Sequence, residues 1–335
     1  MAGYYYGQLS KEKKAVYDML AAGCDALAAV IRVPDLGTEV LSDIYLRMKL
    51  DLPLLFFVTG FHYRKMPGAD HVEVLPDYLF DRGKVKMHRQ AVTVRLERLA
   101  RPLKGKSDRE KELAIHDFIL ENVTYDKLKK SYSHETIGPL TQGVGVCEGI
   151  AKTVKALCDA VGLPCIVALS EAAPEIGVRY RHTWNVVTVE GQRYHVDATF
   201  DNSLQRGMKR YDYFNLDDRH IFRDHQRLVL PLPECSGDKG YFYRSLSFTK
   251  TEDVEKRVRQ ALRKKQEHFV FHWRGGGLNQ EILGQLLEKC AGAAAERGKT
   301  VGCSLNRAQA VIQLDFSDAP AGEVLVEEPD EGQKL

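Results

Sequence analysis

The chain has 335 residues, of which 44% are hydrophobic and 28% charged, a composition typical of a folded protein with two or three domains. Its 48 basic and 46 acidic residues nearly balance, so no broad field of one sign favours nucleic acid or an anionic membrane as a partner. Seven scattered cysteines without a CxxC pair argue against a zinc ribbon, a thioredoxin motif and a dense disulfide scaffold, and they fit a reducing compartment.

The first part of the chain, residues 1–104, is expected to form a helix-rich α+β region. Apolar residues at helical spacing predict helices over residues 11–31, 40–48 and 84–99, and an aromatic stretch predicts a strand over 54–63. The lysines before Cys24 faintly resemble an export signal, but Asp18 interrupts an apolar stretch that is already shorter than the roughly 7–15 residues such a signal needs. We therefore expect a cytoplasmic protein without a membrane span.

A segment rich in proline, glycine and charge, residues 101–107, marks the expected boundary with a second region, residues 105–236. Ser107 stands three residues before Glu110, which predicts a capping box and a helix to about residue 121. Residues 127–145 are polar and predict a loop. Further on, hydrophobic spacing and turn residues predict a helix over 147–161, strands over 165–169, 183–189 and 192–198, and a hairpin turn at Glu190-Gly191.

A third region, residues 237–320, is expected to be a small α+β sandwich of βαβαββ order. Thr249 with Glu252 is expected to cap its first helix. The remaining elements are expected at 246–248, 268–273, around 282–287 and across a hairpin over 301–316. The acidic tail, residues 321–335, is expected to be disordered.

Cys147 is the strongest candidate for a chemical role. It lies in the sequence GVGVCEG, where glycines allow a sharp turn into a helix whose first turn carries the cysteine. The unpaired N–H groups and the positive dipole end of such a helix favour thiolate over thiol, and the thiolate is the nucleophile. The same N–H groups can stabilise an oxyanion.

A cysteine nucleophile needs a base, and the predicted hairpin offers one. His182 begins one strand and Asp197 ends the next at a comparable distance from the turn, so the carboxylate can orient the imidazole. Two alternatives remain open: His195 shares the parity of Asp197 and is a rival base, and Asp201 is a rival orienting carboxylate.

The motifs GVCEG, HTWN and DATFD, in this order, resemble the transglutaminase-like superfamily of papain-fold cysteine enzymes, over roughly residues 107–205. The resemblance implies an α+β papain-like core, in which a helix carrying the cysteine packs on an antiparallel sheet. It also implies that Cys147 is the nucleophile, His182 the general base and acid, and Asp197 the orienting carboxylate. Members often have tryptophan where Phe200 stands, a departure that concerns packing.

Other residues have weaker claims. Gln142, five residues before the cysteine, is a candidate oxyanion donor by analogy with papain-type enzymes, and Trp184 is either core packing or a wall of the cleft. Tyr125 and His134 are possible cleft residues. Because the sequence has no EF-hand loop and no phosphate-binding motif, we expect neither a metal nor a cofactor.

These features favour cysteine-dependent acyl transfer on an amide of a protein or peptide, through a thioester. Water as acceptor makes the enzyme a peptidase or amidase, which we favour because water needs no second substrate site. An amine acceptor makes it a protein-glutamine transamidase. The third alternative is a scaffold or binding module without catalysis. Neither nucleic acid nor membrane is expected as a partner, and the sequence does not indicate an oligomeric state.

Overall fold

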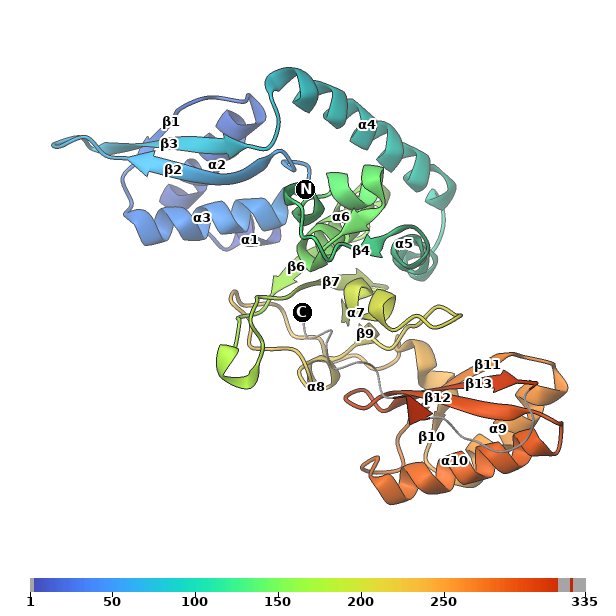
Figure 1. Ribbon diagram of the computed structural model, residues 1–335. Coiled ribbons are helices and arrows are strands. Elements are labelled where there is room, and N and C mark those ends of the chain that lie inside the picture. Colours follow the sequence, from blue (N-terminus) through green and yellow to red (C-terminus); the bar gives the residue numbers. More distant parts are fainter. Residues whose placement is uncertain (1–2, 319–325, 328–335) are drawn as a thin grey trace.

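The computed structural model describes residues 3–318 and 326–327 (Figure 1). Its first part, which we call the N-terminal unit, covers residues 4–78 and contains a three-stranded antiparallel sheet in the order β1-β3-β2. Its elements are α1 (Tyr4–Gly7), α2 (Lys11–Asp25), β1 (Ile31–Pro34), α3 (Thr38–Asp51), β2 (Val58–Arg64) and β3 (His71–Tyr78).

Two predictions for this unit are wrong. The helix predicted over 11–31 ends at Asp25, because Leu27 adopts a left-handed φ of 55° and Ile31 already pairs with Val74 in the sheet. The strand predicted over 54–63 begins only at Val58, and its partner β3 was not predicted.

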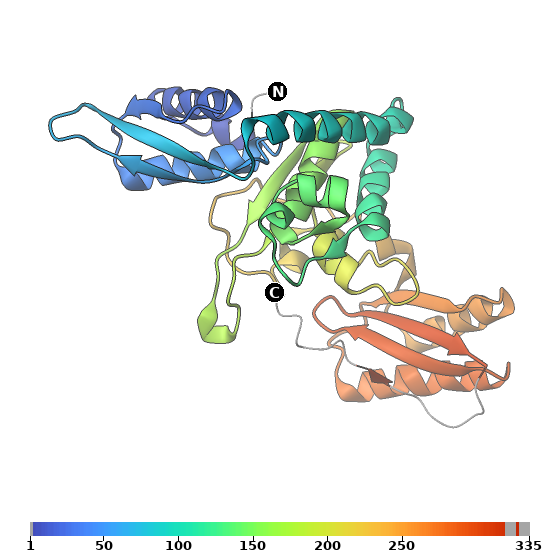
Figure 2. The same ribbon diagram turned by 45° about the horizontal axis from the view of Figure 1, so that its top comes forward.

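A long helix, α4 (Arg82–Ala100), runs from the N-terminal unit across the core, and a 3₁₀ turn, η1 (Arg101–Leu103), leads into α5 (Asp108–Asn122) (Figure 2). The predicted capping box at the start of α5 is confirmed: the Ser107 hydroxyl accepts the N–H of Glu110, and the Glu110 carboxylate accepts the N–H of Ser107.

The core is built on a four-stranded antiparallel sheet in the order β6-β7-β8-β9, with α6 (Cys147–Val161) packed against it. The strands are β6 (Cys165–Leu169), β7 (Thr183–Val189), β8 (Gln192–Val196) and β9 (Phe214–Leu216). The predicted bounds of α6, β6 and β7 are confirmed. The predicted hairpin turn is also present, with Glu190 and Gly191 at φ of 50° and 79°.

Short elements connect these parts of the core. Two strand pieces, β4 (Thr124–Tyr125) and β5 (Val144–Gly145), pair in parallel just before α6. A helix that was not predicted, α7 (Ala198–Ser203), follows β8 directly, so the strand predicted over 192–198 stops at Val196. The others are η2 (Ser131–His134), the π-helix η3 (Gly138–Gln142), η4 (Pro174–Ile176), α8 (Asp218–Ile221) and η5 (Phe242–Leu246).

The C-terminal unit, residues 247–317, has the predicted βαβαββ order. Its sheet runs β10-β11-β13-β12, and a two-residue strand, β14 (Val326–Glu327), pairs with β12 at the edge. The rest of the predicted disordered tail lies outside the described residues. The predicted cap is wrong, because Lys250 is the N-cap residue and contributes no side-chain bond. The elements are β10 (Ser247–Phe248), α9 (Thr251–Arg263), β11 (His268–Trp273), α10 (Gln280–Ala295), β12 (Thr300–Asn306) and β13 (Val311–Ser317).

The two units differ in how they join the core. One continuous apolar cluster contains residues of the N-terminal unit, of α4 to α6 and of the sheet β7–β9. The C-terminal unit has a large apolar cluster of its own between its sheet and the helices α9 and α10, and it meets the core in a small one of Tyr243, Val270 and Val311. The two units lie at opposite ends of the core in both views (Figures 1 and 2). The predicted boundaries at 104/105 and 236/237 stay predictions. Among the described residues, every helix is too short or too polar to span a bilayer.

Candidate active site

Cys147 opens α6, and it alone of the seven cysteines is not buried. Its side chain therefore combines access from solvent with a place at the positive end of a 15-residue helix. The first N–H groups of a helix have no partner within the helix, so here they are available to an oxyanion formed beside the thiol.

The start of α6 packs tightly against the segment that follows β4. A Cβ atom at Gly149 would lie 2.2 Å from the carbonyl oxygen of Ser133, so only glycine fits there without a shift of backbone. The same carbonyl accepts the N–H of Val146 at 3.0 Å, and the Ser133 hydroxyl donates to the buried Asp126. This packing holds the residue before Cys147 in place.

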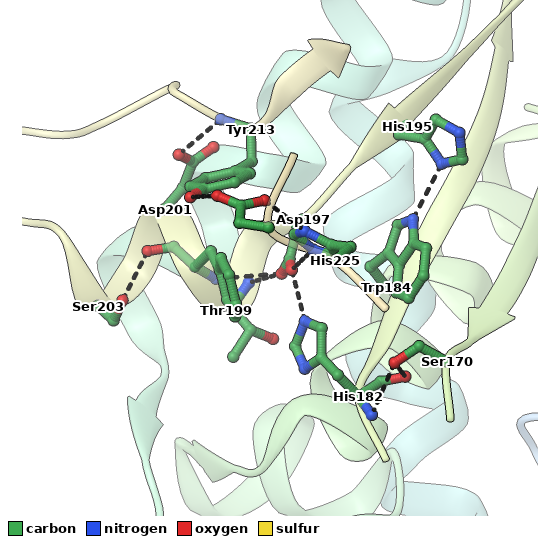
Figure 3. Close-up of polar contacts among 12 residues, drawn as sticks. Ser170, His182, Trp184, His195, Asp197, Thr199, Asp201, Ser203, Tyr213 and His225 are labelled. Atoms are coloured by element: carbon green, nitrogen blue, oxygen red, sulfur yellow. Dashed lines mark hydrogen bonds and ion pairs between the residues drawn. The ribbon is translucent and has the colours of Figure 1, made fainter. Parts of the chain in front are cut away.

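The β7–β8 hairpin brings His182 and Asp197 together. His182 directly precedes β7, Asp197 directly follows β8, and Nε2 of His182 lies 2.6 Å from Oδ2 of Asp197 (Figure 3). Asp197 Oδ1 accepts the N–H groups of Thr199 and Phe200, so this residue is also the N-cap of α7. The predicted contact is confirmed, although Asp197 lies on a helix cap and not on the strand.

The surroundings of this pair favour ionisation of both partners. Burial disfavours an imidazolium, but the Asp197 carboxylate and the nearby Cys147 outweigh burial and raise the pKa of His182 to about 10. Burial also opposes the carboxylate, yet His182 and His225 hold the pKa of Asp197 well below its ordinary value. Nδ1 of His182 is buried and has no nitrogen or oxygen partner among the described residues, and the Cys147 thiol is close enough to help raise the pKa of His182. Because Asp197 occupies Nε2, Nδ1 is the atom left to exchange a proton with the thiol.

Hydrogen bonds made by Asn185 and Ser170 set the position of His182. Asn185 Nδ2 donates to the carbonyl of Ala151, about one turn beyond Cys147, at 3.0 Å. The Ser170 hydroxyl accepts the N–H of His182 at 3.2 Å, and the Ser170 N–H donates to the carbonyl of His182 at 2.9 Å. The strand that carries the histidine is thereby tied both to the nucleophile helix and to β6.

Trp184 packs against the His182 ring in the interior and does not line an open cleft. Its side chain is 1% exposed, and its ring stacks on the imidazole with centroids 5.9 Å apart. Its Nε1–H donates to Nδ1 of His195 at 2.9 Å, so Nε2 of His195 carries the proton that is donated to Asp218 at 2.8 Å. The rival base therefore serves Trp184 and Asp218 and does not contact Asp197.

The other predicted residues are dispersed. Asp201 Oδ2 lies 3.0 Å from Nε2 of His116, and its Oδ1 accepts the N–H of Tyr213, so it is not the partner of His182. Gln142 is exposed at the end of η3, and its amide donates to Thr141. Its role as an oxyanion donor stays a prediction.

Tyr125 and His134 lie beside the nucleophile. Burial and the nearby Cys147 raise the pKa of Tyr125, whose backbone pairs with Gly145, two residues before the thiol. His134 Nδ1 lies 3.4 Å from a carboxylate oxygen of Glu148, the residue after Cys147. Both positions are consistent with the predicted cleft.

Two sets of side chains among the described residues bring three possible metal ligands within 4.8 Å: His182, Asp197 and His225, and His195, Asp218 and Cys235. The second set does not suit a cation, because the indole N–H on Nδ1 leaves Nε2 of His195 protonated and without a lone pair. In the first set, Nε2 of His182 and Nε2 of His225 both lie within hydrogen-bond distance of the Asp197 carboxylate. The predicted absence of a metal stays a prediction.

Residues 97–198 match the transglutaminase-like superfamily, and this range contains Cys147, His182 and Asp197. This part of the chain is a transglutaminase-like core. Its α+β fold is the papain-like one predicted from the sequence. A comparison with curated proteins found no match.

Three solved structures resemble parts of the chain. A TGase aligns with 45% of this chain and 46% of its own at 14% identity and a TM-score of 0.30. A candidate cysteine protease from Cytophaga hutchinsonii aligns with 42% of this chain and 62% of its own, at 18% identity and a TM-score of 0.28. A candidate protease from Parabacteroides distasonis aligns with 42% and 36%, at 15% identity and a TM-score of 0.26. The chain therefore spans less than two thirds of each of these structures.

Two residues that contact the site were not predicted from the sequence. Asn185 belongs to the HTWN motif and lies among apolar residues of β7. An amide side chain in such a strand is buried and needs a hydrogen-bond partner, and this was the signal that could have identified it. His225, whose Nε2 lies 2.9 Å from Asp197, belongs to an irregular segment beyond α8 and gave no signal of spacing or motif.

Proposed function

We propose that the transglutaminase-like core is a cysteine-dependent acyl-transfer enzyme that cleaves an amide bond by way of a thioester, as a peptidase or amidase. One observation carries the proposal. The single accessible cysteine starts a helix beside a histidine whose Nε2 is 2.6 Å from a buried carboxylate. This combination supplies a nucleophile, a proton carrier and an orienting group.

The proposed steps follow from the geometry. The Cys147 sulfur attacks the amide carbon and forms a C–S bond, while the carbonyl oxygen becomes an oxyanion near the first turn of α6. His182 then gives its proton to the leaving nitrogen, the C–N bond breaks, and a thioester remains. Water attacks the thioester and passes a proton to His182, the C–S bond breaks, and a carboxylic acid leaves. Asp197 stabilises the imidazolium throughout.

Two loops beside the site support a peptide as the substrate. One follows β4, whose Tyr125 pairs with Gly145 just before the nucleophile, and the other leads into His182. They touch where Lys129 Nζ lies 3.9 Å from the ring centroid of Tyr180. Both loops expose apolar side chains, at 77% for Leu128, 61% for Ile176 and 56% for Tyr180.

The charges on these loops favour an acidic peptide. Five exposed cations on them form no ion pair with a carboxylate of the described residues: Lys127, Lys129, Lys130, Arg179 and Arg181. The carboxylates nearest the nucleophile are occupied instead, Asp126 by Ser133 and Glu148 by Lys152. These five cations outnumber the exposed carboxylates of the same loops, Glu171 and Glu175, so the loops attract anionic residues of a substrate.

Labelling of thiols tests the proposal. If the proposed nucleophile is activated, iodoacetamide at pH 6 should modify Cys147 at least about 10-fold faster than a free thiol, because a nearby imidazolium and a helix N-terminus both favour a reactive sulfur. The variant His182→Ala should lose this advantage, whereas His195→Ala, the matched change on the neighbouring strand, should keep it. If Cys147 reacts no faster than a free thiol, with or without His182, the enzymatic function is rejected. The alternative is then a scaffold or binding module without catalysis.

A peptide library assayed with and without an added primary amine separates hydrolysis from transamidation. Release of new carboxyl ends in the absence of amine supports the peptidase, and product formed only with amine supports the transamidase. Matched peptides with Glu or Lys beside the scissile amide test the substrate class. We expect kcat/KM to be roughly 10-fold higher for the acidic peptide at low salt, and the preference to shrink as salt is added. Equal rates would reject the acidic preference and keep the enzyme.

A further inference from the structure

His225 is a second histidine on the carboxylate of Asp197. Its side chain is fully buried, and its Nε2 lies 2.9 Å from Asp197 Oδ2, the same oxygen that lies 2.6 Å from Nε2 of His182 (Figure 3). One carboxylate oxygen therefore serves two imidazole rings, whose centroids are 5.3 Å apart. The mechanism described above does not use the second ring.

The other nitrogen of His225 faces another carboxylate. Nδ1 lies 2.9 Å from Oδ1 of Asp224. Ionised carboxylates only accept hydrogen bonds, so a histidine held by one at each nitrogen donates from both and is an imidazolium. Burial and the nearby His182 oppose this charge, but the bonds to Asp197 and Asp224 outweigh them and raise the pKa of His225.

A chain of polar contacts continues from Asp224 to the C-terminal unit. Asp224 accepts the hydroxyl of Tyr213 at 2.5 Å, and both of its oxygens lie 3.3 Å from Nε2 of Gln309. Gln309 stands in the turn between β12 and β13, is 1% exposed, and also donates to the carbonyl of His220 at 3.1 Å. An amide of the C-terminal unit is thereby linked to Asp197 through two intervening side chains.

We propose that His225 is a positioning residue of the active site, which holds Asp197 toward His182 and moderates the basicity of His182, and that Gln309 keeps it in place. The proposal rests on the function proposed above. A histidine that binds its proton too firmly is a good base but a poor acid toward a leaving amine. A second cation on the shared oxygen weakens the hold of Asp197 on the His182 proton, so the proton can be given up.

Every titratable group that faces His225 enters this balance. Asp197 and Asp224 favour its charge, and His182 on β7 opposes it. Tyr213 contacts its ring and binds Asp224 as a neutral phenol, while Trp184 and Phe200 cover the remaining ring faces. His195 on β8 is more distant, and burial keeps its pKa low, with His225 adding to this effect.

The variant His225→Gln tests the proposal, because glutamine keeps one donor for Asp197 and removes the charge. We expect kcat to fall about 10- to 100-fold with little change in KM, since an interaction with the acid–base pair is altered and not one with substrate. The alkaline limb of the pH profile of kcat/KM, which reports the His182 proton, should move to higher pH. NMR titration of the His182 ring should show the same upward shift without any substrate.

Two buried glutamines of the β12–β13 hairpin, Gln309 in its turn and Gln313 on β13, give a matched pair for the second half of the proposal. Gln309→Ala should lower kcat roughly 3- to 10-fold and shift the alkaline limb in the same direction. Gln313→Ala removes an equally buried amide of the same unit that binds Arg210 and the carbonyl of Arg206, and it should leave both readouts unchanged. Thermal unfolding of each variant identifies those that fail to fold.

Three results would overturn the proposal. The first is a folded His225→Gln whose kcat and His182 titration match the wild type. The second is an equal effect of Gln309→Ala and Gln313→Ala. The third is activity that is lost to a chelator and restored by zinc, which would make His182, Asp197 and His225 metal ligands. If the wild type shows no turnover but the NMR shift appears, the positioning role stands and the enzymatic function fails.

Discussion

The two units that flank the core reach opposite halves of the active site, and they do so with different chemistry. Lys49 of the N-terminal unit is buried, and its Nζ lies 3.1 Å from Oε1 of Glu135. The same carboxylate oxygen binds Nζ of Lys152 at 3.0 Å. Lys152 in turn holds Glu148, the residue after the nucleophile, at 2.6 Å. Ions therefore link this unit to the helix that carries Cys147.

Neutral amides make the corresponding polar contacts of the C-terminal unit, beside a small apolar cluster in which its Val270 and Val311 pack with Tyr243. Gln309 reaches Asp224, Gln313 reaches Arg210 at 3.1 Å, and Asn306 reaches Asp212 at 3.0 Å. The ionic partners of these amides all belong to the segment between β8 and α9. Breaking a buried ion pair leaves an uncompensated charge, at about 3–5 kcal/mol, whereas losing one amide that binds an ion costs less, about 1.5–3 kcal/mol. We therefore expect changes at the first junction to affect stability most and changes at the second to affect catalysis most.

Lys152→Met should have the largest effect on stability. Lys152 is 0% exposed, and its removal leaves Glu135, whose side chain is 4% exposed, with one cation fewer in the interior. We expect the free energy of unfolding to fall by about 3–5 kcal/mol, measured by urea denaturation. Lys155→Met in the same helix is the control, because its partner Asp159 is 43% exposed, and it should cost about 1 kcal/mol or less. Equal losses of unfolding free energy in Lys152→Met and Lys155→Met would contradict the larger contribution expected from the buried ion pair.

His182→Ala should lower stability in a pH-dependent way. The pKa of His182 is raised in the folded protein, so its contribution is complete below the ordinary histidine value and disappears as the pH rises toward about 10. We expect a loss of about 1–3 kcal/mol near pH 6 and a smaller one at pH 10, measured by denaturation at both values.

His116 provides the control of opposite sign. Burial lowers the pKa of His116 to about 4, so the folded protein holds this histidine in its neutral form. The stability that His116 contributes is lost as the pH falls from the ordinary histidine pKa toward about 4. The difference between wild type and His116→Ala should therefore grow as the pH rises from about 4 to about 6.5. A His182 variant that follows the His116 pattern would contradict the charged pair with Asp197.

The parts of the site that the sequence predicted rest on local signals. Gly162 adopts a left-handed φ of 73° and ends α6, and Glu190-Gly191 forms the turn of the β7–β8 hairpin. The bounds of the helix and of the hairpin could therefore be predicted from turn residues that directly adjoin them. The three catalytic candidates lie next to these elements. A transglutaminase-like core could be recognised for the same reason, since its motifs coincide with the starts and ends of α6, β7 and β8.

The parts that the sequence did not predict depend on contacts between distant or irregular segments. His225 meets Asp197 across 28 residues from a segment without periodicity, and Gln309 meets Asp224 across 85. The helix cap at Asp197 was missed because its residues also alternate as a strand would. No spacing rule connects such residues, so only the folded chain shows that the C-terminal unit reaches the site.

Asn306→Ala probes the junction with the C-terminal unit alone. Its Nδ2 donates to Asp212 at 3.0 Å, and loss of this buried bond should cost about 1.5–3 kcal/mol. Hydrogen exchange should become faster in β12 and β13, while α6 and β7 stay protected as in the wild type. Exchange that increases equally in α6 would show that this unit and the core unfold together, and that the small cluster of Tyr243, Val270 and Val311 couples their two larger interiors.

Ser107→Ala tests the other junction with the smallest expected effect. The capping box of Ser107 and Glu110 starts α5, whose apolar face belongs to the cluster shared with the N-terminal unit. Loss of the cap should lower the free energy of unfolding by about 1 kcal/mol in a single transition, since unit and core share one interior. Thr249→Ala is the matched control, because Thr249 is exposed and Lys250, not Thr249, is the N-cap residue of α9, so no change is expected. A separate early transition in Ser107→Ala would mean that the N-terminal unit is as independent as the C-terminal one.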